Sequence, residues 1–361
     1  MPPGFNPKFN MAKLLIVVRK VDSEDLLLGF FHAWIEAFAR RFDKVTVIGL
    51  GVGRHQLPAN VKVLSLGEES GRNKVKYLFN FFRHIIQERY NYDAVFVHAS
   101  PVYIILGAAF WRLLRKKISL WYAHGSANWI LKLAEVCTDI IFTSTPEGCR
   151  LKSSKIRIVG QGIDTDLFRP TGQTDFSPLK IVTVGRISLS KDYETLVNAM
   201  EIIKETHPEG KAEILGGTIT ARDRTYLDYL KRLIRKKGLE ELIILAGSVP
   251  NRLLPAKLQA ANIFVNMGHT GSLDKAILEA MSCGMPILTC NEAAIRALGV
   301  HAEQLMFPKR DALALAQKIK WLLELSADER QNLGKVLREI VLAKHNLSDL
   351  VAKIKQQLYS I

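Results

Sequence analysis

The stretch IVTVGRISLSKDYETLVNAM, residues 181–200, reads as a buried strand, a polar loop and an amphipathic helix. The short apolar run before Gly185 is typical of a strand that is covered on both faces of its sheet. After Asp192, the apolar residues recur at helical spacing. A strand that leads through a loop into a helix is the repeating unit of parallel sheets, so this stretch predicts an α/β fold.

The same unit recurs along most of the chain in two series. Strands are predicted at 13–18, 45–49, 61–65, 94–97, 118–122 and 140–143, then at 180–184, 212–215, 242–245, 262–265 and 286–289, with helices at 26–40, 72–89, 192–206, 223–237 and 274–282. Gly, Pro, Thr and Asp concentrate at 160–178, which indicates a domain boundary. We therefore predict two Rossmann-like domains, 1–165 and 166–345, with parallel sheets facing across a central cleft, and a helix at 346–361 that packs back toward the first domain.

The composition excludes several classes of protein. The net charge of +15 is uneven: residues 1–170 carry 24 Lys+Arg against 14 Asp+Glu, or +10, and the remainder carries 26 against 21, or +5. This excess indicates an anionic partner, and because the sequence holds no nucleic-acid recognition motif, no nucleic acid is expected. The four cysteines fit no metal-ligand spacing, so we expect no metal and a reducing, cytoplasmic location. The longest uncharged stretch, 94–111, is interpreted as a strand, a loop and a helix start rather than a membrane span.

Two cations stand where the first strand of the second series leads into its helix. Arg186 follows Gly185 directly, and Lys191 precedes the helix. Free backbone N–H groups and the dipole at a helix N-terminus favour anions, so these cations indicate a phosphate site. The alternative is a solvated loop whose lysine pairs with a glutamate of the following helix.

Two further elements of the second half fit such a pocket. Gly216 and Gly217 end a predicted strand, where backbone can approach a ligand closely. TGSLDKAILEAMSCGMPIL, residues 270–288, reads as a loop, a helix and a strand, with Glu279 one turn into the helix. A carboxylate there can accept both hydroxyls of a ribose. The alternative is a glutamate on the helix surface.

The order of these pieces resembles the donor half of glycosyltransferase family 4, whose members have the two-domain GT-B fold. The shared features are the strand followed by G-R with a lysine five residues after the arginine, the Gly pair of LGG, the segment AGSVPNRLLPAKLQAANIFV, the segment LEAMSCGMPIL and the linker GQGIDTDLFRP. Together they cover most of residues 155–290.

By that resemblance, Arg186 and Lys191 bind the donor diphosphate and Glu279 binds the ribose, with a UDP- or GDP-sugar as co-substrate and no metal or other cofactor. The family usually has another glutamate eight residues before Glu279, in contact with the donor sugar. This chain has Gly271 there. The remaining donor-site candidates are Gly185, Gly216, Gly217, Ser272, Asp274 and Lys275, of which Asp274 and Lys275 are expected to replace the missing glutamate.

The first half resembles the family less, since it offers only Gly29 where the family usually has a Gly pair. His98 and His124 each end a predicted strand, at the functional rim of such sheets. His124 matches the family's strand-end histidine better, so we expect it near the transferred sugar, with Arg186 and Lys191 as the other catalytic residues. A structural role is the alternative for both histidines, and Glu147 is expected to pair locally.

Basic and aromatic residues interleave at 71–90. The expected inward face is Val75, Leu78, Phe82 and Ile85, and a second face holds Lys74, Tyr77, Phe81 and His84. Cations over aromatic rings suit an acidic lipid surface, so a peripheral contact with an acidic membrane is a further expectation. An ordinary solvated helix face is the alternative.

These expectations combine into one function. The resemblance implies a metal-independent, retaining hexosyltransferase that moves a sugar from a nucleotide donor to a hydroxyl of a glycan or lipid-linked acceptor, in cell-surface glycan or glycolipid synthesis. The unusual Gly271 leaves open a nucleotide-sugar-binding protein of the same fold that has lost transfer activity.

Overall fold

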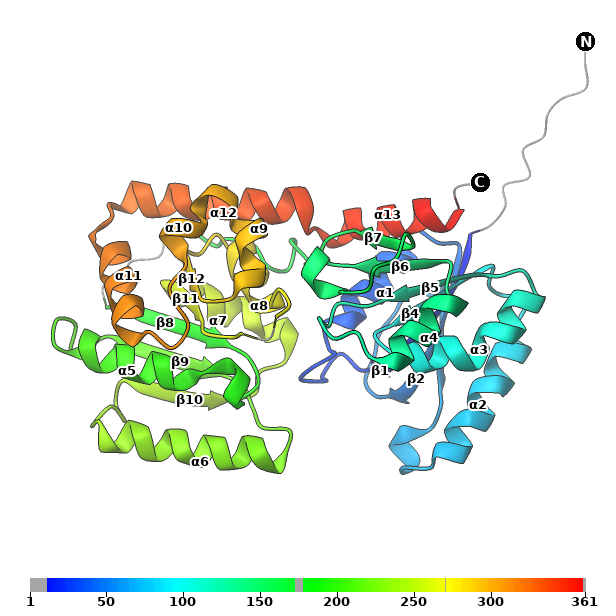
Figure 1. Cartoon of the computed structure of the whole chain (residues 1–361), viewed down its shortest axis with the longest axis horizontal. Coiled ribbons are helices and arrows are strands. Elements are labelled where there is room, and N and C mark those ends of the chain that lie inside the picture. The colour runs from blue at the N-terminus through cyan, green and yellow to red at the C-terminus, as the bar shows by residue number, and fades with distance from the viewer. Residues whose placement is uncertain (1–11, 173–177, 270, 360–361) are drawn as a thin grey trace, which may run out of the picture.

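The computed structural model describes residues 12–172, 178–269 and 271–359, so positions 173–177 of the predicted linker and position 270 of the loop before Gly271 lie outside it. The described chain forms two domains that lie side by side (Figure 1). Each has a parallel sheet with helices on its faces, which confirms the predicted α/β class.

The first domain contains a sheet of seven described strands in the order β3-β2-β1-β4-β5-β6-β7. Its strands are β1 (Lys13–Val21), β2 (Lys44–Val52), β3 (Val61–Ser65), β4 (Ala94–His98), β5 (Lys117–Trp121), β6 (Ile140–Thr143) and β7 (Ile156–Ile158), and its helices are α1 (Phe31–Ala39), α2 (Lys74–Gln87), α3 (Pro101–Leu113) and α4 (Trp129–Cys137). The strand order reverses beside β1, so the loop after β1 stands at the crevice where such sheets bind ligands.

The second domain contains five described strands in the order β10-β9-β8-β11-β12. They are β8 (Lys180–Val184), β9 (Lys211–Leu215), β10 (Ile243–Gly247), β11 (Ile263–Asn266) and β12 (Ile287–Thr289). The helices are α5 (Tyr193–Lys204), α6 (Ala221–Lys236), α7 (Leu254–Gln259), α8 (Lys275–Ser282), α9 (Ile295–Leu298), α10 (Ala302–Leu305), α11 (Ala312–Glu324) and α12 (Ala327–Lys344).

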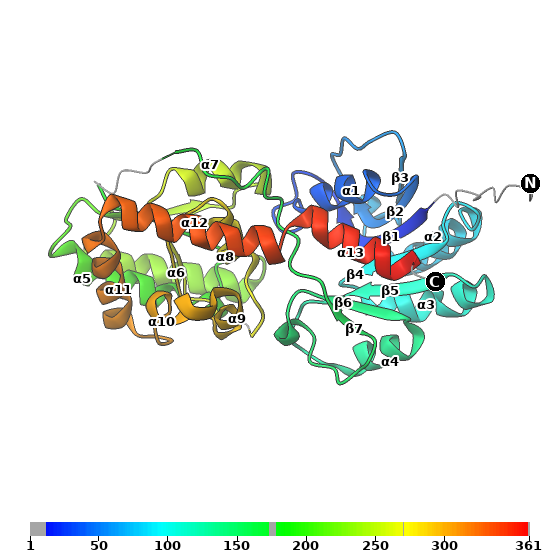
Figure 2. The ribbon, with the colours of Figure 1, turned by 90° about the horizontal axis from the view of Figure 1, so that it is seen from above.

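The last helix, α13 (Leu347–Tyr359), returns to the first domain, as Figure 2 shows. Its buried Leu350 and Ile354 belong to the same apolar core as Trp34 and Phe38 of α1. The Tyr359 hydroxyl donates to the carbonyl of Lys13 at 2.8 Å. The last helix in the chain therefore completes the core of the domain that comes first.

The chain crosses between the domains at two neighbouring places. Ile163 donates its backbone N–H to the carbonyl of His345 at 2.7 Å, and Leu347 donates to the carbonyl of Ile163 at 2.9 Å. The indole Nε1 of Trp34 donates to the carbonyl of Gly162 at 3.1 Å. The two crossings are thus paired to each other and anchored on α1.

Several elements differ from the prediction. The helix expected at 26–40 begins only at Phe31, because the Asp25 carboxylate accepts the N–H groups of Leu27 and Leu28 and holds a turn there. The short edge strand β7 and the helices α11 and α12 were not predicted.

The predicted orientation of α2 is wrong. Phe81 and Ile85 are fully buried, whereas Val75 is 78% exposed and Phe79 is 65% exposed. Phe81 packs against aromatic rings of α3, and the His84 ring lies 3.0 Å from the carbonyl of Ser65. Ile85 is buried as predicted, but Phe81 and His84, which were expected on the free face, are buried as well, and a different apolar stripe is exposed. None of the helices in the described ranges is long and apolar enough to cross a membrane.

We predict that Ile354→Ala weakens the first domain rather than the second. A large-to-small change in a filled core costs about 2–5 kcal/mol, because a cavity remains. Hydrogen–deuterium exchange should quicken in α1 and stay unchanged in α6. Lys353→Ala, at an exposed position of the same helix, is the matched control. Unchanged exchange in α1 would show that α13 is not part of that core.

Candidate functional site

The two domains enclose a cavity of about 550 Å³ between the carboxyl ends of their strands. Its first-domain wall is the loop after β1, and its second-domain wall is formed by the ends of β8, β9 and β10. The predicted residues that line it are Gly185, Arg186, Gly216 and Gly217. Because both sheets are parallel, residues far apart in sequence meet at this rim.

The glycines are there because the backbone is crowded. A Cβ atom at Gly216 would lie 1.8 Å from the carbonyl oxygen of Gly185, and one at Gly217 would lie 2.1 Å from the Ser248 hydroxyl. A side chain at Gly216 would push the ends of β8 and β9 apart, and one at Gly217 would displace the Ser248 side chain. The strand ends therefore present bare backbone to the cavity.

The predicted cations are both paired with carboxylates. Arg186 is half-exposed, and its Nε lies 3.9 Å from Asp223 Oδ2. Lys191 lies beside Gly185, and its Nζ is 2.6 Å from Asp274 Oδ2. The expected alternative partner of Lys191, a glutamate on its own helix, is wrong, since Asp274 comes from the loop before α8. The same carboxylate oxygen accepts a hydrogen bond from the Asn266 amide at 2.9 Å.

The loop before α8 faces the first domain. Gly271 has a positive φ of 78°, and its carbonyl accepts a hydrogen bond of 3.1 Å from Arg150 Nη2. A Cβ atom at Gly125 would lie 3.3 Å from the same carbonyl oxygen, so the loop that carries His124 stands directly opposite. Ser272 is held through its carbonyl, which accepts from Asn291 Nδ2 at 2.9 Å.

His124 is exposed at the cleft. Its backbone N–H and that of Gly125 both donate to the carbonyl of Gly148, at 2.8 and 3.1 Å, which fixes the loop. Its ring Nδ1 lies 3.2 Å from the Ser126 hydroxyl. His98, by contrast, is buried among the rings of Phe31, Trp34 and Trp121, and this burial lowers its pKa to about 3. His98 is therefore a neutral packing residue, as the structural alternative proposed.

Glu279 is only 4% exposed, so the alternative of a glutamate on the helix surface is wrong. Asn251 Nδ2 donates to its Oε1 at 3.2 Å, and Lys275 Nζ lies 4.0 Å from the same oxygen. Lys275 Nζ also lies 3.4 Å from the ring centroid of Phe30 in the first domain. Burial raises the pKa of Glu279, and burial lowers the pKa of Lys275 to about 8, against the opposing influence of Glu279 and Asp164.

Among the described residues, two ion pairs cross between the domains. Glu24 receives two hydrogen bonds from Arg252, at 2.9 and 3.2 Å. Glu147 pairs with Arg296 at 3.0 Å, so the expectation that it pairs locally is wrong. Arg150, Arg252 and Arg296 were not found by sequence reasoning, because a contact across more than a hundred residues leaves no local pattern.

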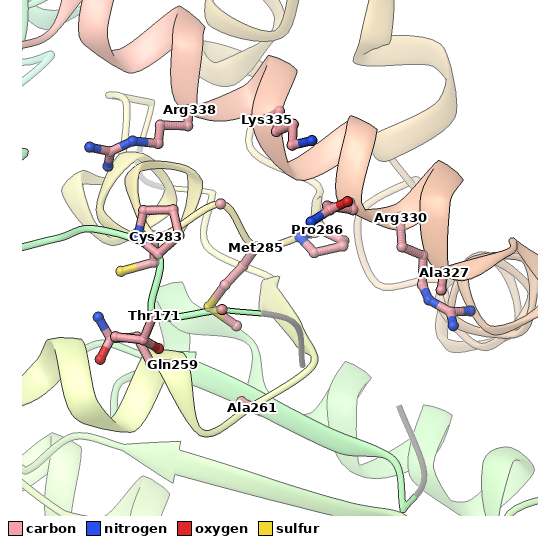
Figure 3. A pocket seen from close by; sticks show the side chains of 14 residues that line it. Thr171, Gln259, Ala261, Cys283, Met285, Pro286, Ala327, Arg330, Lys335 and Arg338 are labelled. Atoms are coloured by element: carbon pink, nitrogen blue, oxygen red, sulfur yellow. The ribbon is translucent and has the colours of Figure 1, made fainter. Parts of the chain in front are cut away.

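A second cavity, also of about 550 Å³, lies at the opposite end of the strands of the second sheet. Figure 3 shows the residues that line it. Ala261 and Pro286, which line it, precede β11 and β12, whereas the cleft is at the other end of these strands. It contains none of the predicted donor residues, so the cleft is the candidate site. Among the residues described, no group of three or more His, Cys, Asp and Glu side chains is placed to hold a metal ion.

We predict a pH effect from the buried Lys275. Between about pH 8 and pH 10.5, the unfolded chain keeps the proton and the folded chain has released it, so stability should rise with pH. Relative to Lys275→Met, the wild-type free energy of unfolding should increase across this range by at most about 1.4 kcal/mol per pH unit. Urea unfolding of both proteins from about pH 7 to about pH 10 measures the difference. A flat difference would mean that Lys275 titrates as in the unfolded chain.

Parts of this sequence are similar to those of known proteins. The family model for glycosyl transferases group 1 matches residues 165–339. The putative colanic acid biosynthesis glycosyltransferase WcaL of Escherichia coli is 29% identical over 217 residues, which cover 57% of this chain and 50% of that protein. The chain spans about half the length of the curated relatives it matches.

Solved structures match over almost the whole chain. Sucrose-phosphate synthase from Thermosynechococcus elongatus aligns with a TM-score of 0.76 at 19% identity, covering 96% of this chain and 98% of that one. Anabaena HepE in complex with UDP aligns with a TM-score of 0.76 at 14% identity, covering 97% and 100%. Residues 165–339 are therefore similar to the glycosyl transferases group 1 family, and the chain as a whole has the two-domain GT-B fold.

Proposed function

We propose that the protein is a retaining, metal-independent hexosyltransferase that uses a nucleotide-diphosphate sugar. The observation that carries this proposal is the interdomain cavity lined by Gly185, Arg186, Gly216 and Gly217. Bare backbone on one wall and a guanidinium at its edge suit a ligand that is flat, polar and anionic at one end. A nucleoside diphosphate has these properties.

In this proposal, Arg186 and Lys191 stabilise the leaving diphosphate. Negative charge grows on the bridging oxygen as the sugar departs, and fixed cations at a dry site stabilise it without reorganisation. The two cations take the part that a metal ion takes at other diphosphate sites, so none is expected here. The buried Glu279 accepts the ribose hydroxyls, and its fixed amide partner Asn251 keeps it in place.

The acceptor enters from the first domain in this proposal. His124 is exposed in the loop that contacts Gly271, so the transferred sugar would lie beside this contact. A glycan or lipid-linked acceptor is supported by the name of WcaL, a colanic acid biosynthesis glycosyltransferase. UDP as the nucleotide is supported by the complex of HepE, and GDP is the competing expectation.

Titration with UDP-, GDP- and ADP-sugars tests the donor site. Arg186→Ala and Lys191→Ala should each weaken binding about ten- to hundredfold, the value of one charge-assisted hydrogen bond. Glu279→Gln should weaken binding of the free nucleotide as well, because the ribose contact does not involve the sugar. Lys231→Ala, on the exposed side of α6, is the control.

The outcomes separate the candidates. Binding without turnover on any glycan or lipid acceptor would favour the degenerate nucleotide-sugar-binding protein. Binding that is equal in wild type, Arg186→Ala and Lys191→Ala would contradict the diphosphate assignment. No binding of any nucleotide sugar would contradict the function itself.

We further propose that α2 contacts the acidic cytoplasmic face of a membrane, which would bring the cleft to a lipid-linked acceptor. Val75, Phe79 and Ile86 are exposed along one stripe of the helix. Lys74 and Arg83 flank this stripe and are exposed too. Apolar side chains that enter the headgroup layer, with cations beside them, are the pattern of an interfacial helix.

We predict that the double substitution Val75→Ser with Phe79→Ser weakens binding to acidic vesicles. Each buried apolar side chain contributes roughly 1.5 kcal/mol or more, so the two together should change binding at least about tenfold. Cosedimentation with phosphatidylglycerol vesicles measures the effect, and phosphatidylcholine vesicles show the part that charge plays. Val300→Ser, at a valine that is 89% exposed in the second domain, is the matched control. Equal cosedimentation of the double variant and the control would leave α2 as an ordinary solvated helix.

A further inference from the structure

The shortest of the ion pairs described above joins a predicted diphosphate ligand to a carboxylate. Lys191 Nζ and Asp274 Oδ2 are 2.6 Å apart, and the two side chains are only 16% and 14% exposed. The Arg186 pair is longer, at 3.9 Å, and its arginine is 43% exposed. Of these two predicted diphosphate ligands, Lys191 is therefore the one whose charge is already neutralised by a nearby carboxylate.

Asp274 is turned toward Lys191 rather than toward its own helix. It occupies the N-cap position of α8, which aspartate usually caps by accepting a backbone N–H. Here its side chain makes no capping hydrogen bond. The carboxylate instead accepts from Lys191 and from the Asn266 amide, at 2.6 and 2.9 Å.

The carboxylate is held in this position by a buried network. Asn266 is 2% exposed, and its Oδ1 accepts from the Thr289 hydroxyl and from the backbone N–H of Gly268, both at 3.2 Å. Asn266 ends β11 and Thr289 ends β12, so the network spans two neighbouring strands. The Lys191–Asp274 contact is thus a built part of the strand ends and not a chance contact of two mobile side chains.

We propose that Asp274 competes with the donor diphosphate for Lys191. This inference rests on the proposed function and specifies how the same site is regulated. When the site is empty, the carboxylate neutralises the lysine, and an incoming diphosphate must take over its hydrogen bonds against a neighbouring negative charge. The competition lowers the affinity for nucleoside diphosphates, and it speeds release of the nucleoside diphosphate that transfer leaves behind.

The test compares wild type with Asp274→Asn, which keeps the shape and removes the charge. Calorimetric titration with UDP, GDP and ADP should show binding about tenfold tighter for the diphosphate that the wild type prefers. Stopped-flow dissociation of that diphosphate should slow by a similar factor. Binding of uridine, guanosine and adenosine should not change, because the competition concerns only the phosphates.

Two further variants test whether the change in binding is due to the Asp274 carboxylate. Asp274→Ser, which removes the carboxylate with a smaller side chain, should tighten binding in the same direction if Asp274→Asn unfolds. Glu201→Gln removes a carboxylate from an ion pair between α5 and Lys237, outside the cleft, and should leave all affinities unchanged. A merely structural role of Asp274 predicts weaker binding, so the sign of the change distinguishes the two.

Each other outcome has one meaning. Equal or weaker diphosphate binding in both Asp274 variants overturns the proposal, and if Lys191→Ala still loses affinity, the proposed function stands. Tightening of nucleosides and diphosphates alike also overturns it, since pocket shape rather than charge would then be responsible. Absence of binding to wild type and variants overturns both the proposal and the function.

Discussion

The paired crossing between the domains is the interaction on which the rest of the structure depends. The backbone around Ile163 and the backbone around Asn346 run side by side as a short parallel bridge. Because α13 is buried against α1, the second crossing segment is held beside the first. This fixes which ends of the two sheets face each other. The cavity, and the contact between the loop of His124 and the loop of Gly271, lie between the domains as a consequence.

Charge compensation governs the cleft that results. Arg186, Lys191 and Lys275 each have a carboxylate neighbour, at 3.9, 2.6 and 4.0 Å. Burying an unpaired charge is costly, so a site that must stay empty between reactions needs such partners. An anionic ligand then takes the place of one of these carboxylates beside its cation, rather than binding to a cation that has no partner. The basic character of the whole chain is therefore a poor guide to the charge that an incoming donor meets.

Local sequence patterns were enough to predict most of the fold. The apolar runs of β1, β4 and β8 and the helical spacing of α5 are features of a few consecutive residues, and they predicted the parallel α/β architecture. The three-residue strand β7 has no such pattern, since two of its three residues are exposed. The orientation of α2 was mispredicted because both of its faces carry apolar residues. Only the rings of α3 decide between them.

The candidate site likewise contains residues that the sequence could predict and residues that it could not. Gly216 and Gly217 were recognisable because backbone at a strand end can approach a ligand closely, and Glu279 because its segment resembles that of a known family. The partner of Lys191 and the cations that cross the cleft were not recognisable, because they depend on how two separately folded units are placed. Position in the chain says which residues reach the rim. It does not say which of them neutralise one another there.

The pairing at Ile163 and Asn346 also limits how the two domains can move. The two chain segments that form this joint lie next to each other, so the domains can bend about the joint without breaking it. What opposes that bending on the far side of the cleft is a set of surface ion pairs, such as Glu24 with Arg252 and Glu147 with Arg296. Exposed pairs of this kind stabilise a structure little, because solvent screens them. Lys275 against the Phe30 ring and Arg150 on the Gly271 carbonyl also cross the cleft, so a cleft that opens must break these contacts as well.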